Sequence, residues 1–179
     1  MLDIGGTPYN WALAPATPRL TLLNLPRAFE PPMPGVDWVA ADGCALPFAD
    51  GAFDVVFSNS VIEHLTSNER QQTFAREVAR VGKRYWVQTP NRWFPVETHL
   101  LTPFVHYLPK RWQGNLVRRW TGWAALTGIK GERKRFYIEH YLADIRLLSR
   151  REMRGLFPKA TIVAERFLGM TKSLIAVRR

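Results

Sequence analysis

The feature that most constrains this chain of 179 residues is a series of short apolar runs separated by loops and helix-like stretches. Such runs predict buried strands at Leu2–Ile4, Leu20–Leu25, Val36–Ala40, Phe53–Ser58 and Tyr85–Gln88. Strands that alternate with crossover segments form parallel sheets covered by helices, so we expect an α/β fold with a mostly parallel sheet. Two later runs, Thr161–Phe167 and Ser173–Val177, predict a closing antiparallel pair with its turn near Gly169.

Two helices carry capping signals. Thr66 and Glu69 have the spacing of a capping box, apolar residues follow at helical spacing, and Gly82 can close the helix as its C-cap. Ser149 and Glu152 predict a second capping box near the end of the chain. Prolines between positions 26 and 34 predict an extended loop between the second and third strands.

Composition narrows the class of protein. No uncharged stretch is long enough for a membrane span, and Asp3 directly after Met1 and Leu2 argues against a secretory signal. A single cysteine, Cys44, excludes an intrachain disulfide and a cysteine-based zinc site. We therefore expect a cytoplasmic protein with one domain over residues 1–179, in which 91–145 is an aromatic and basic insertion.

Polar residues and glycines follow four of the predicted strands. Asp3, Gly5 and Gly6 lie at the end of the first strand, and Asn24 ends the second. A second group follows the third and fourth strands: Asp42, Gly43 and Asn59. Ligands of open α/β sheets bind at the carboxyl ends of the strands, so these residues predict one binding crevice.

The stretches Ala41–Phe48 and Asp50–Val56 resemble the link between the third and fourth strands of class I S-adenosylmethionine-dependent methyltransferases, especially the type 11 methyltransferase-domain subgroup. The resemblance covers roughly residues 1–90 and 146–179. It implies a Rossmann-like sheet, S-adenosyl-L-methionine as cofactor, and methyl transfer. The fold does not fix the acceptor, for which we expect a small-molecule or lipid-linked compound.

The resemblance also implies a set of cofactor-binding residues at the strand ends: Asp3, Gly5, Gly6, Asn24, Asp42, Gly43, Cys44 and Asn59. Asp3 would meet the methionine amino group, and Asn24 stands where the family usually has an acid that binds the ribose. Asp42 would receive the adenine amino group, with Gly43 and Cys44 beside the ring. Asn59 would lie near the transferred methyl group.

The sequence departs from the family pattern near its start. Thr7 and Tyr9 stand where the second and third glycines of the first loop usually lie, and Met1 is only two residues before Asp3. We therefore expect an N-terminally short member of the family. A catalytically inactive, methyltransferase-like binding module is the alternative. A dehydrogenase is disfavoured, because its alternating glycines are absent.

Catalytic residues are less defined than cofactor residues. Glu63 and His64 are candidates for a neighbour of the sulfonium or a base, or they form the first turn of a helix with no chemical role. The segment after the fifth strand supplies candidate substrate-lining residues: Thr89, Asn91, Trp93 and His99. No histidine spacing predicts a metal site.

Positive charge is concentrated late in the chain. Residues 110–154 contain twelve Lys or Arg and four acids, interleaved with tryptophans. Leu116, Trp120, Trp123 and Ala124 fall on one face of a possible helix. This segment predicts either a cover over the substrate pocket or a peripheral contact with anionic membrane lipid. Nucleic-acid binding is not expected, because no recognised nucleic-acid-binding module accompanies the charge.

Overall fold

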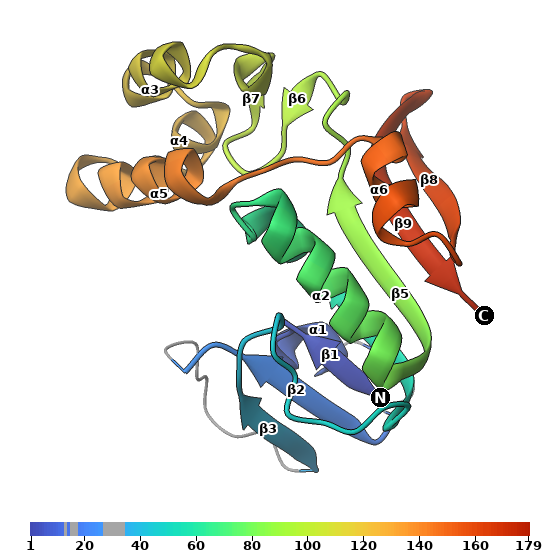
Figure 1. Cartoon of the computed structure of the whole chain (residues 1–179). Coiled ribbons are helices and arrows are strands. Elements are labelled where there is room, and N and C mark those ends of the chain that lie inside the picture. The colour runs from blue at the N-terminus through green and yellow to red at the C-terminus, as the bar shows by residue number, and fades with distance from the viewer. Residues whose placement is uncertain (13, 15–17, 27–34) are drawn as a thin grey trace.

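Seven strands form one mixed sheet in the part of the chain that this computed structural model describes, residues 1–12, 14, 18–26 and 35–179 (Figure 1). In chain order the strands are β1 (Leu2–Ile4), β2 (Leu20–Asn24), β3 (Val36–Ala40), β4 (Phe53–Asn59), β5 (Gly82–Pro90), β8 (Thr161–Phe167) and β9 (Met170–Arg178). Their spatial order is β3-β2-β1-β4-β5-β9-β8. Strands β1 to β5 run parallel, whereas β9 is antiparallel to both β5 and β8. The predicted α/β class and the antiparallel closing pair are confirmed.

The remaining elements connect or cover these strands. They are α1 (Pro8–Ala12), the 3-10 helix η1 (Ile62–His64), α2 (Asn68–Val81), β6 (Val96–Glu97), β7 (Thr102–Pro103), the 3-10 helix η2 (Val105–Tyr107), α3 (Lys110–Arg119), α4 (Gly122–Thr127), α5 (Gly131–Asp144) and α6 (Arg150–Leu156). Short β6 and β7 pair with each other outside the main sheet.

The predicted strands differ from the observed ones only at their ends. β2 stops at Asn24, one residue early, and β5 is longer than predicted because it pairs with β4 from Gly82 and with β9 up to Pro90. The turn between β8 and β9 consists of Leu168 and Gly169, both with positive φ, which suits a two-residue hairpin. The extended loop predicted at 26–34 lies almost entirely outside the described residues.

Helix α2 begins one residue later than the Thr66–Glu69 spacing predicts. Ser67 is the N-cap, because its hydroxyl accepts the N–H of Arg70 at 3.2 Å. Gly82 is the C-cap, as predicted, but its φ of −101° is not left-handed, and the chain continues directly into β5. A Cβ at Gly82 would lie 2.7 Å from Val56 Cγ2, so only glycine allows the helix end to approach the sheet this closely.

The capping box at the start of α6 is confirmed. The Ser149 hydroxyl accepts the N–H of Glu152 at 3.3 Å, and the Glu152 carboxylate accepts the N–H of Ser149 at 2.8 Å. The other carboxylate oxygen of Glu152 pairs with Arg92 at 3.1 Å and with Arg146 at 2.9 Å. One acid therefore ties α6 to two arginines far away in the sequence.

The two faces of the sheet are covered differently. Helices α2 and α6 pack on one face and share its core, in which Phe74, Val78 and Met153 are fully buried. On the opposite face Trp11 of α1 meets Phe57 edge-on at 5.6 Å, and Phe57 stacks on Trp86 at 4.7 Å. Side chains alternate along a strand, so Val56 joins the first core while its neighbour Phe57 faces α1.

Residues 91–145 lie beyond the carboxyl end of β5 (Figure 1). A second, smaller core holds this segment together and consists of Leu100, Val105, Val117 and Ile138, with Ile145 packed against it. Among the residues that the structure describes, no helix combines the length and apolarity needed to cross a membrane.

The predicted single helix face with Leu116, Trp120, Trp123 and Ala124 is wrong. Helix α3 ends at Arg119 and Trp120 is its C-cap, after which Thr121 caps α4 by accepting the N–H of Ala124 at 3.1 Å. A Cβ at Gly122 would lie 2.1 Å from the carbonyl oxygen of Leu101, so this contact also depends on glycine. The Thr–Gly pair thus divides the segment into two helices.

Candidate functional site

A crevice of about 300 Å³ opens at the carboxyl ends of β1 and β2, between these strands and α2. Four of the residues predicted at strand ends line this crevice: Gly5, Asn24, Asp42 and Gly43. The other lining residues include Val61, His64 and Leu65 from the turn after β4, and Arg70 and Phe74 from α2. The structure thus brings together residues from three strand ends, as parallel strands in one sheet allow.

The glycine turn after β1 is tight on both sides. Gly5 has φ of +77°, and a Cβ there would lie 2.4 Å from Val61 Cγ2. A Cβ on Gly6 would lie 1.8 Å from Asp3 Oδ2. The backbone of this turn can therefore lie close to a ligand only because neither position carries a side chain.

Asp3 lies beneath that turn rather than in the open crevice. Its side chain is buried, Oδ2 accepts the indole N–H of Trp11 at 2.7 Å, and Oδ1 has no hydrogen-bond partner among the described residues. Burial raises the pKa of Asp3 to about 6, and the Trp11 hydrogen bond opposes this only in part. Asp3 is therefore a carboxyl group with one oxygen left to accept a donor.

Asn24 and Asp42 both make hydrogen bonds at the crevice wall. The Asn24 amide donates to the carbonyl oxygen of Gly6 at 2.8 Å, which ties β2 to the glycine turn. Asp42 accepts the N–H of Cys44 at 2.9 Å and pairs with Arg70 at 2.8 Å. Partial burial opposes ionisation of Asp42, but these two donors hold its pKa below the usual range. Cys44 lies behind Asp42, and its thiol donates to the Arg70 carbonyl oxygen.

Glu63, His64 and His99 form a cluster beside the crevice. Glu63 is fully buried, and its Oε2 accepts the hydroxyl of Thr89 at 2.9 Å. Burial raises the pKa of Glu63 to about 7. His99 Nε2 lies 3.8 Å from Glu63 Oε1, and the rings of His64 and His99 meet edge-on at 5.3 Å.

Glu97 fixes the other side of the His99 ring. Its Oε1 lies 2.6 Å from His99 Nδ1, and its Oε2 accepts the N–H of Leu100 at 2.7 Å. Burial lowers the pKa of His99, but the hydrogen bond and charge of Glu97, together with the charge of Glu63, raise it overall. The sequence analysis did not single out Glu97. The short spacing between Glu97, which ends β6, and His99 in the turn that follows is the signal that could have found it.

A polar cavity of about 550 Å³ adjoins this cluster at His99. His99 and Asn59 both line it, together with Gln88 and Lys172. Asn59 thus lies on this cavity and is not among the residues that line the crevice. His64 lines the crevice and His99 lines the polar cavity, so the cluster stands between the two spaces.

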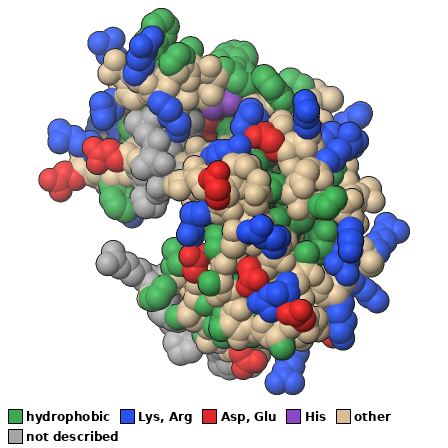
Figure 2. Space-filling model, viewed as in Figure 1, with side chains coloured by type: hydrophobic (Ala, Val, Ile, Leu, Met, Phe, Trp, Pro, Cys, Tyr) green, Lys and Arg blue, Asp and Glu red, His purple; other side chains and the backbone are tan. Residues whose placement is uncertain are grey.

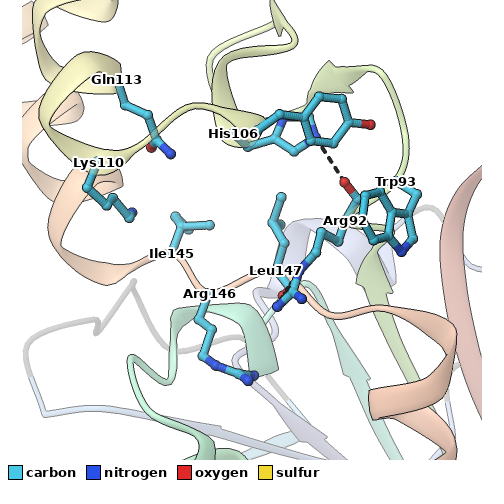
Figure 3. A pocket seen from close by; sticks show the side chains of 9 residues that line it. Arg92, Trp93, His106, Lys110, Gln113, Ile145, Arg146 and Leu147 are labelled. Atoms are coloured by element: carbon cyan, nitrogen blue, oxygen red, sulfur yellow. Dashed lines mark hydrogen bonds between the residues drawn. The ribbon is translucent and has the colours of Figure 1, made fainter.

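A third space, the cationic cavity, has a volume of about 470 Å³ (Figure 3). Its charged residues are Arg92, Lys110 and Arg146, and Trp93 is the predicted substrate-lining residue on its wall. Lys110 and Gln113 project from α3 on one side, and Arg92 and Trp93 lie on the other (Figure 3). Burial lowers the pKa of Lys110, and the charge of Glu97 opposes this.

Hydrogen bonds connect Arg146 of the cationic cavity to the 3-10 turn η1 beside the crevice. The backbone N–H of Arg146 donates to the carbonyl oxygen of Glu63 at 2.7 Å, and the guanidinium of Arg146 donates to the side chain of Gln71. Gln71 in turn donates to the carbonyl oxygen of Ile62 at 3.0 Å. The 3-10 turn η1 is therefore held from both sides. No motif or spacing in the sequence marks Arg146 or Gln71 as a site residue.

Thr89 and Asn91, also predicted to line the substrate site, are buried. Thr89 donates to Glu63, as described above, and the Asn91 amide donates to the carbonyl oxygen of Thr171 at 2.9 Å. Both side chains therefore make internal hydrogen bonds in this structure. Trp93, by contrast, is 67% exposed.

Comparison with known protein families gives a match over part of the chain. Residues 18–85 match the family model described as a methyltransferase domain, Methyltransf_11. No functionally curated protein matches the sequence. The matched segment contains β2 to β4, α2 and the first residues of β5, which include Asn24, Asp42 and the Glu63–His64 pair.

Solved structures share the fold over nearly the whole chain. The structure of PigF with SAH has a TM-score of 0.53 at 17% identity, covering 99% of this chain and 55% of PigF. A protein proposed to be a methyltransferase, solved in complex with the Trm112 methyltransferase activator of Haloferax volcanii, has a TM-score of 0.55 at 16% identity, covering 98% of this chain and 80% of that one. A SAM-dependent methyltransferase of Methanosarcina mazei has a TM-score of 0.50 at 10% identity, with 98% and 89% covered.

These likenesses concern the fold, and the chain spans little more than half the length of PigF. The family segment adds sequence information to them, because it covers the strands and the helix that form the crevice. Residues 18–85 thus match the Methyltransf_11 methyltransferase domain, and the described part of the chain has the fold of the S-adenosylmethionine-dependent methyltransferases compared above.

Proposed function

We propose that this chain binds S-adenosylmethionine in the crevice and transfers its methyl group to an acceptor that carries an anionic group. When bound, this cofactor supplies an electrophilic methyl group on its sulfonium sulfur. The observation that carries the proposal is the glycine turn over Asp3. Gly5 and Gly6 have no room there for a side chain, and a buried oxygen of Asp3 has no hydrogen-bond partner in the part of the chain that the structure describes. Such a turn suits a ligand with an ammonium group and a close approach to the backbone.

The residues at the crevice suit the rest of this cofactor. Asp3, Gly5 and Gly6 would hold the methionine end, and Asn24 would bind the ribose hydroxyls. Asp42, with Gly43 and Cys44 beside it, would bind the adenine. Gly43 has little space, because a Cβ there would lie 3.0 Å from Phe74 Cε2, so the ring of Phe74 limits the thickness of the adenine site. Asn59 would lie toward the acceptor side.

The cationic cavity supports an acceptor with an anionic group. Three cations line it and one acid, Glu152, pairs with two of them, which leaves an excess of positive charge. Trp93 and Tyr107 add aromatic surface on the same wall. Phosphate or carboxylate bound by Arg and Lys beside an aromatic ring is a common way to hold such a ligand. A soluble small molecule and a lipid-linked acceptor both fit this chemistry.

We also propose that the protein makes peripheral contact with anionic membrane surfaces. Figure 2 shows Lys and Arg side chains over the region of α3 and α5 and along the opposite edge of the molecule. Trp112, Trp120 and Phe136 are at least half exposed on those helices or beside them. Each cation near an anionic surface contributes about 1 kcal/mol, so vesicle binding should rise with anionic lipid and fall with salt.

Calorimetry with S-adenosylmethionine, S-adenosylhomocysteine and NAD tests the cofactor. We expect both adenosyl compounds to bind with a stoichiometry of one per chain and NAD not to bind. Tighter binding of NAD than of S-adenosylhomocysteine would overturn the proposal, and so would the absence of adenosyl binding in a chain shown to be folded by circular dichroism.

An inactive binding module is the second candidate, and one observation favours it. The carboxylate of Asp42 is already engaged by Arg70 and Cys44, and the Asn24 amide by Gly6. Radiolabelled methyl transfer to lipid extracts and small-molecule extracts separates the two functions. Cofactor binding without any labelled product in either extract would favour the module.

A further inference from the structure

We propose that Glu63, His64 and His99 bind one divalent transition-metal ion at the boundary between the crevice and the polar cavity. The binding of the ion is independent of the proposed methyl transfer, whereas its place beside the acceptor rests on that function. The three residues each offer one ligand atom, and these atoms all lie within 4.8 Å of one another.

The distance between Glu63 and His99 fits a shared ion better than a hydrogen bond. Glu63 Oε1 and His99 Nε2 are 3.8 Å apart, beyond the usual range for an N–H···O hydrogen bond of about 2.7–3.2 Å. Two ligand atoms bound to zinc at about 2.0–2.2 Å lie about 3.5 Å apart at a tetrahedral angle. A small closing movement of the two side chains would therefore bring both atoms onto one ion.

Glu63 supplies the second observation. Its side chain is fully buried, and Oε1 makes no hydrogen bond to any residue that the structure describes, while Oε2 accepts the hydroxyl of Thr89. A buried carboxylate oxygen without a partner carries a large desolvation cost, which a bound cation would offset. Thr89 holds the carboxylate so that the unpartnered oxygen is the one that faces His99.

His99 has the surroundings of a metal-binding histidine. Buried Glu97 lies 2.6 Å from His99 Nδ1, and the Leu100 N–H holds the second oxygen of Glu97. A carboxylate that accepts from one ring nitrogen orients the other nitrogen toward a metal and increases its basicity. A divalent cation would also balance the two buried carboxylates of Glu63 and Glu97.

The ligand types indicate the kind of ion. Two imidazoles and one carboxylate suit zinc, cobalt(II) or iron(II), whereas magnesium and calcium prefer oxygen ligands alone. His64 is exposed at the crevice. The ion would therefore keep at least one coordination position open to solvent or to an oxygen of the acceptor.

Cobalt(II) titration of the chelator-stripped protein tests the site, because bound cobalt has a visible absorption spectrum. We expect one cobalt ion per chain, displaced by zinc but not by a hundredfold excess of magnesium. His99→Gln and Glu63→Gln should each weaken cobalt binding at least 100-fold. Glu97→Gln should weaken it 10- to 100-fold, as expected for a residue that orients a ligand.

His106→Gln is the matched control, since His106 lies outside the cluster and bonds the carbonyl oxygen of Arg92 instead. Its cobalt affinity should equal that of the unmodified chain. His64→Gln changes an exposed side chain and should also weaken cobalt binding. It therefore tests the site even if the variants of Glu63 or His99 fail to fold. The proposal is wrong if the folded, stripped chain binds neither cobalt nor zinc stoichiometrically, or if His64→Gln and His99→Gln bind as tightly as the unmodified chain.

Binding of S-adenosylhomocysteine is measured on the same samples. Adenosyl binding without metal binding would overturn the metal site and leave the proposed function standing. Metal binding without adenosyl binding would support the metal site and count against the proposed function.

Discussion

The crevice and the cationic cavity are built in different ways. The crevice is formed by backbone turns at neighbouring strand ends and by one helix, and its lining comes from residues 4–74. The cationic cavity is formed by long side chains from three separate segments, 92–93, 106–113 and 145–147. The first is defined mainly by shape and the second mainly by charge. Changes of volume should therefore damage the crevice, and changes of charge or salt should affect the cavity.

The largest effect is expected from Gly6→Ala, which fills the tightest position at the crevice. The new Cβ would lie 1.8 Å from Asp3 Oδ2, so the turn or the buried carboxylate must move. We expect a loss of about 4 kcal/mol in the free energy of unfolding, above the usual 1–3 kcal/mol for overpacking because the overlap is with a polar group that cannot be moved cheaply. Urea denaturation measures it.

Gly155→Ala is the matched control for that change. Gly155 lies within α6, and no atom of the residues that the structure describes comes within 4 Å of the position of an added Cβ, so alanine there should leave stability equal or slightly higher. Equal stability of Gly6→Ala and the unmodified chain would contradict the close packing of Gly6 on Asp3.

The second effect concerns Asp3 and pH. Its pKa is raised to about 6, so between about pH 4 and pH 6 the folded chain keeps a proton that the unfolded chain releases. The contribution of Asp3 to the free energy of unfolding should therefore fall as pH rises through this window, by about 3 kcal/mol at most, and level off above it, whereas Glu63, with a pKa raised to about 7, extends the fall of the total to higher pH. In Asp3→Asn the decrease in the free energy of unfolding that Asp3 causes between pH 4 and pH 6 should disappear. Urea denaturation at several pH values measures this.

Asp54→Asn serves as the control for the pH effect. Asp54 is exposed and pairs with Lys83, which lowers its pKa, so its removal should leave the fall between pH 4 and 6 in place. A pH profile that is the same in Asp3→Asn and in the unmodified chain would show that Asp3 does not titrate as its burial requires.

A third, smaller effect is expected on cofactor affinity. Asp42→Ala should weaken binding of S-adenosylhomocysteine by about 2 kcal/mol, roughly 30-fold, because a polar group of the ligand then lacks its partner. Calorimetry measures this, with Asp50→Ala as a control that removes an exposed acid paired with Arg80. Unchanged affinity in Asp42→Ala would remove Asp42 from the adenine site.

The smallest effect is expected in the cationic cavity. Phenyl phosphate, a simple aromatic anion, should raise the melting temperature of the chain, and Lys110→Gln should weaken its binding by about 1 kcal/mol, roughly fivefold. Higher salt should weaken phenyl phosphate more than S-adenosylhomocysteine, because the cavity acts through partly exposed charge. Equal salt dependence of the two ligands would remove the distinction between shape and charge.

The same difference explains what the sequence could predict. Strand positions and the glycine turn follow from local patterns, so Gly5, Asn24, Asp42 and Gly43 were found and do line one crevice. Local signals located the start of α2 only to within a residue, because Thr66 and Ser67 are both good caps and tertiary contacts choose between them.

Contacts between distant side chains could not be predicted in this way. Arg70 pairs with Asp42 across 28 positions, and Arg146 meets Gln71 across 75. Such pairs depend on how α2 and the 145–147 segment pack on the sheet, which no local pattern encodes. The cationic cavity and the Glu63–His64–His99 cluster arise from contacts of this kind. Trp93 is the one predicted site residue on the cavity, and the Glu63–His64 pair and His99 are separate candidates in the sequence, with nothing to indicate that they lie together.

The direct junction of α2 with β5 has a mechanical consequence. Gly82 ends the helix and begins the strand, so no loop residue is available to absorb relative movement of the two elements. Helix and strand run in opposite directions, which brings Arg70, near the helix start, and Thr89, near the strand end, to the same edge of the sheet. Because no loop joins the helix to the strand, a displacement at one of these residues should be transmitted to the other. The wall of the crevice at Arg70 and the support of Glu63 at Thr89 should therefore move as one body.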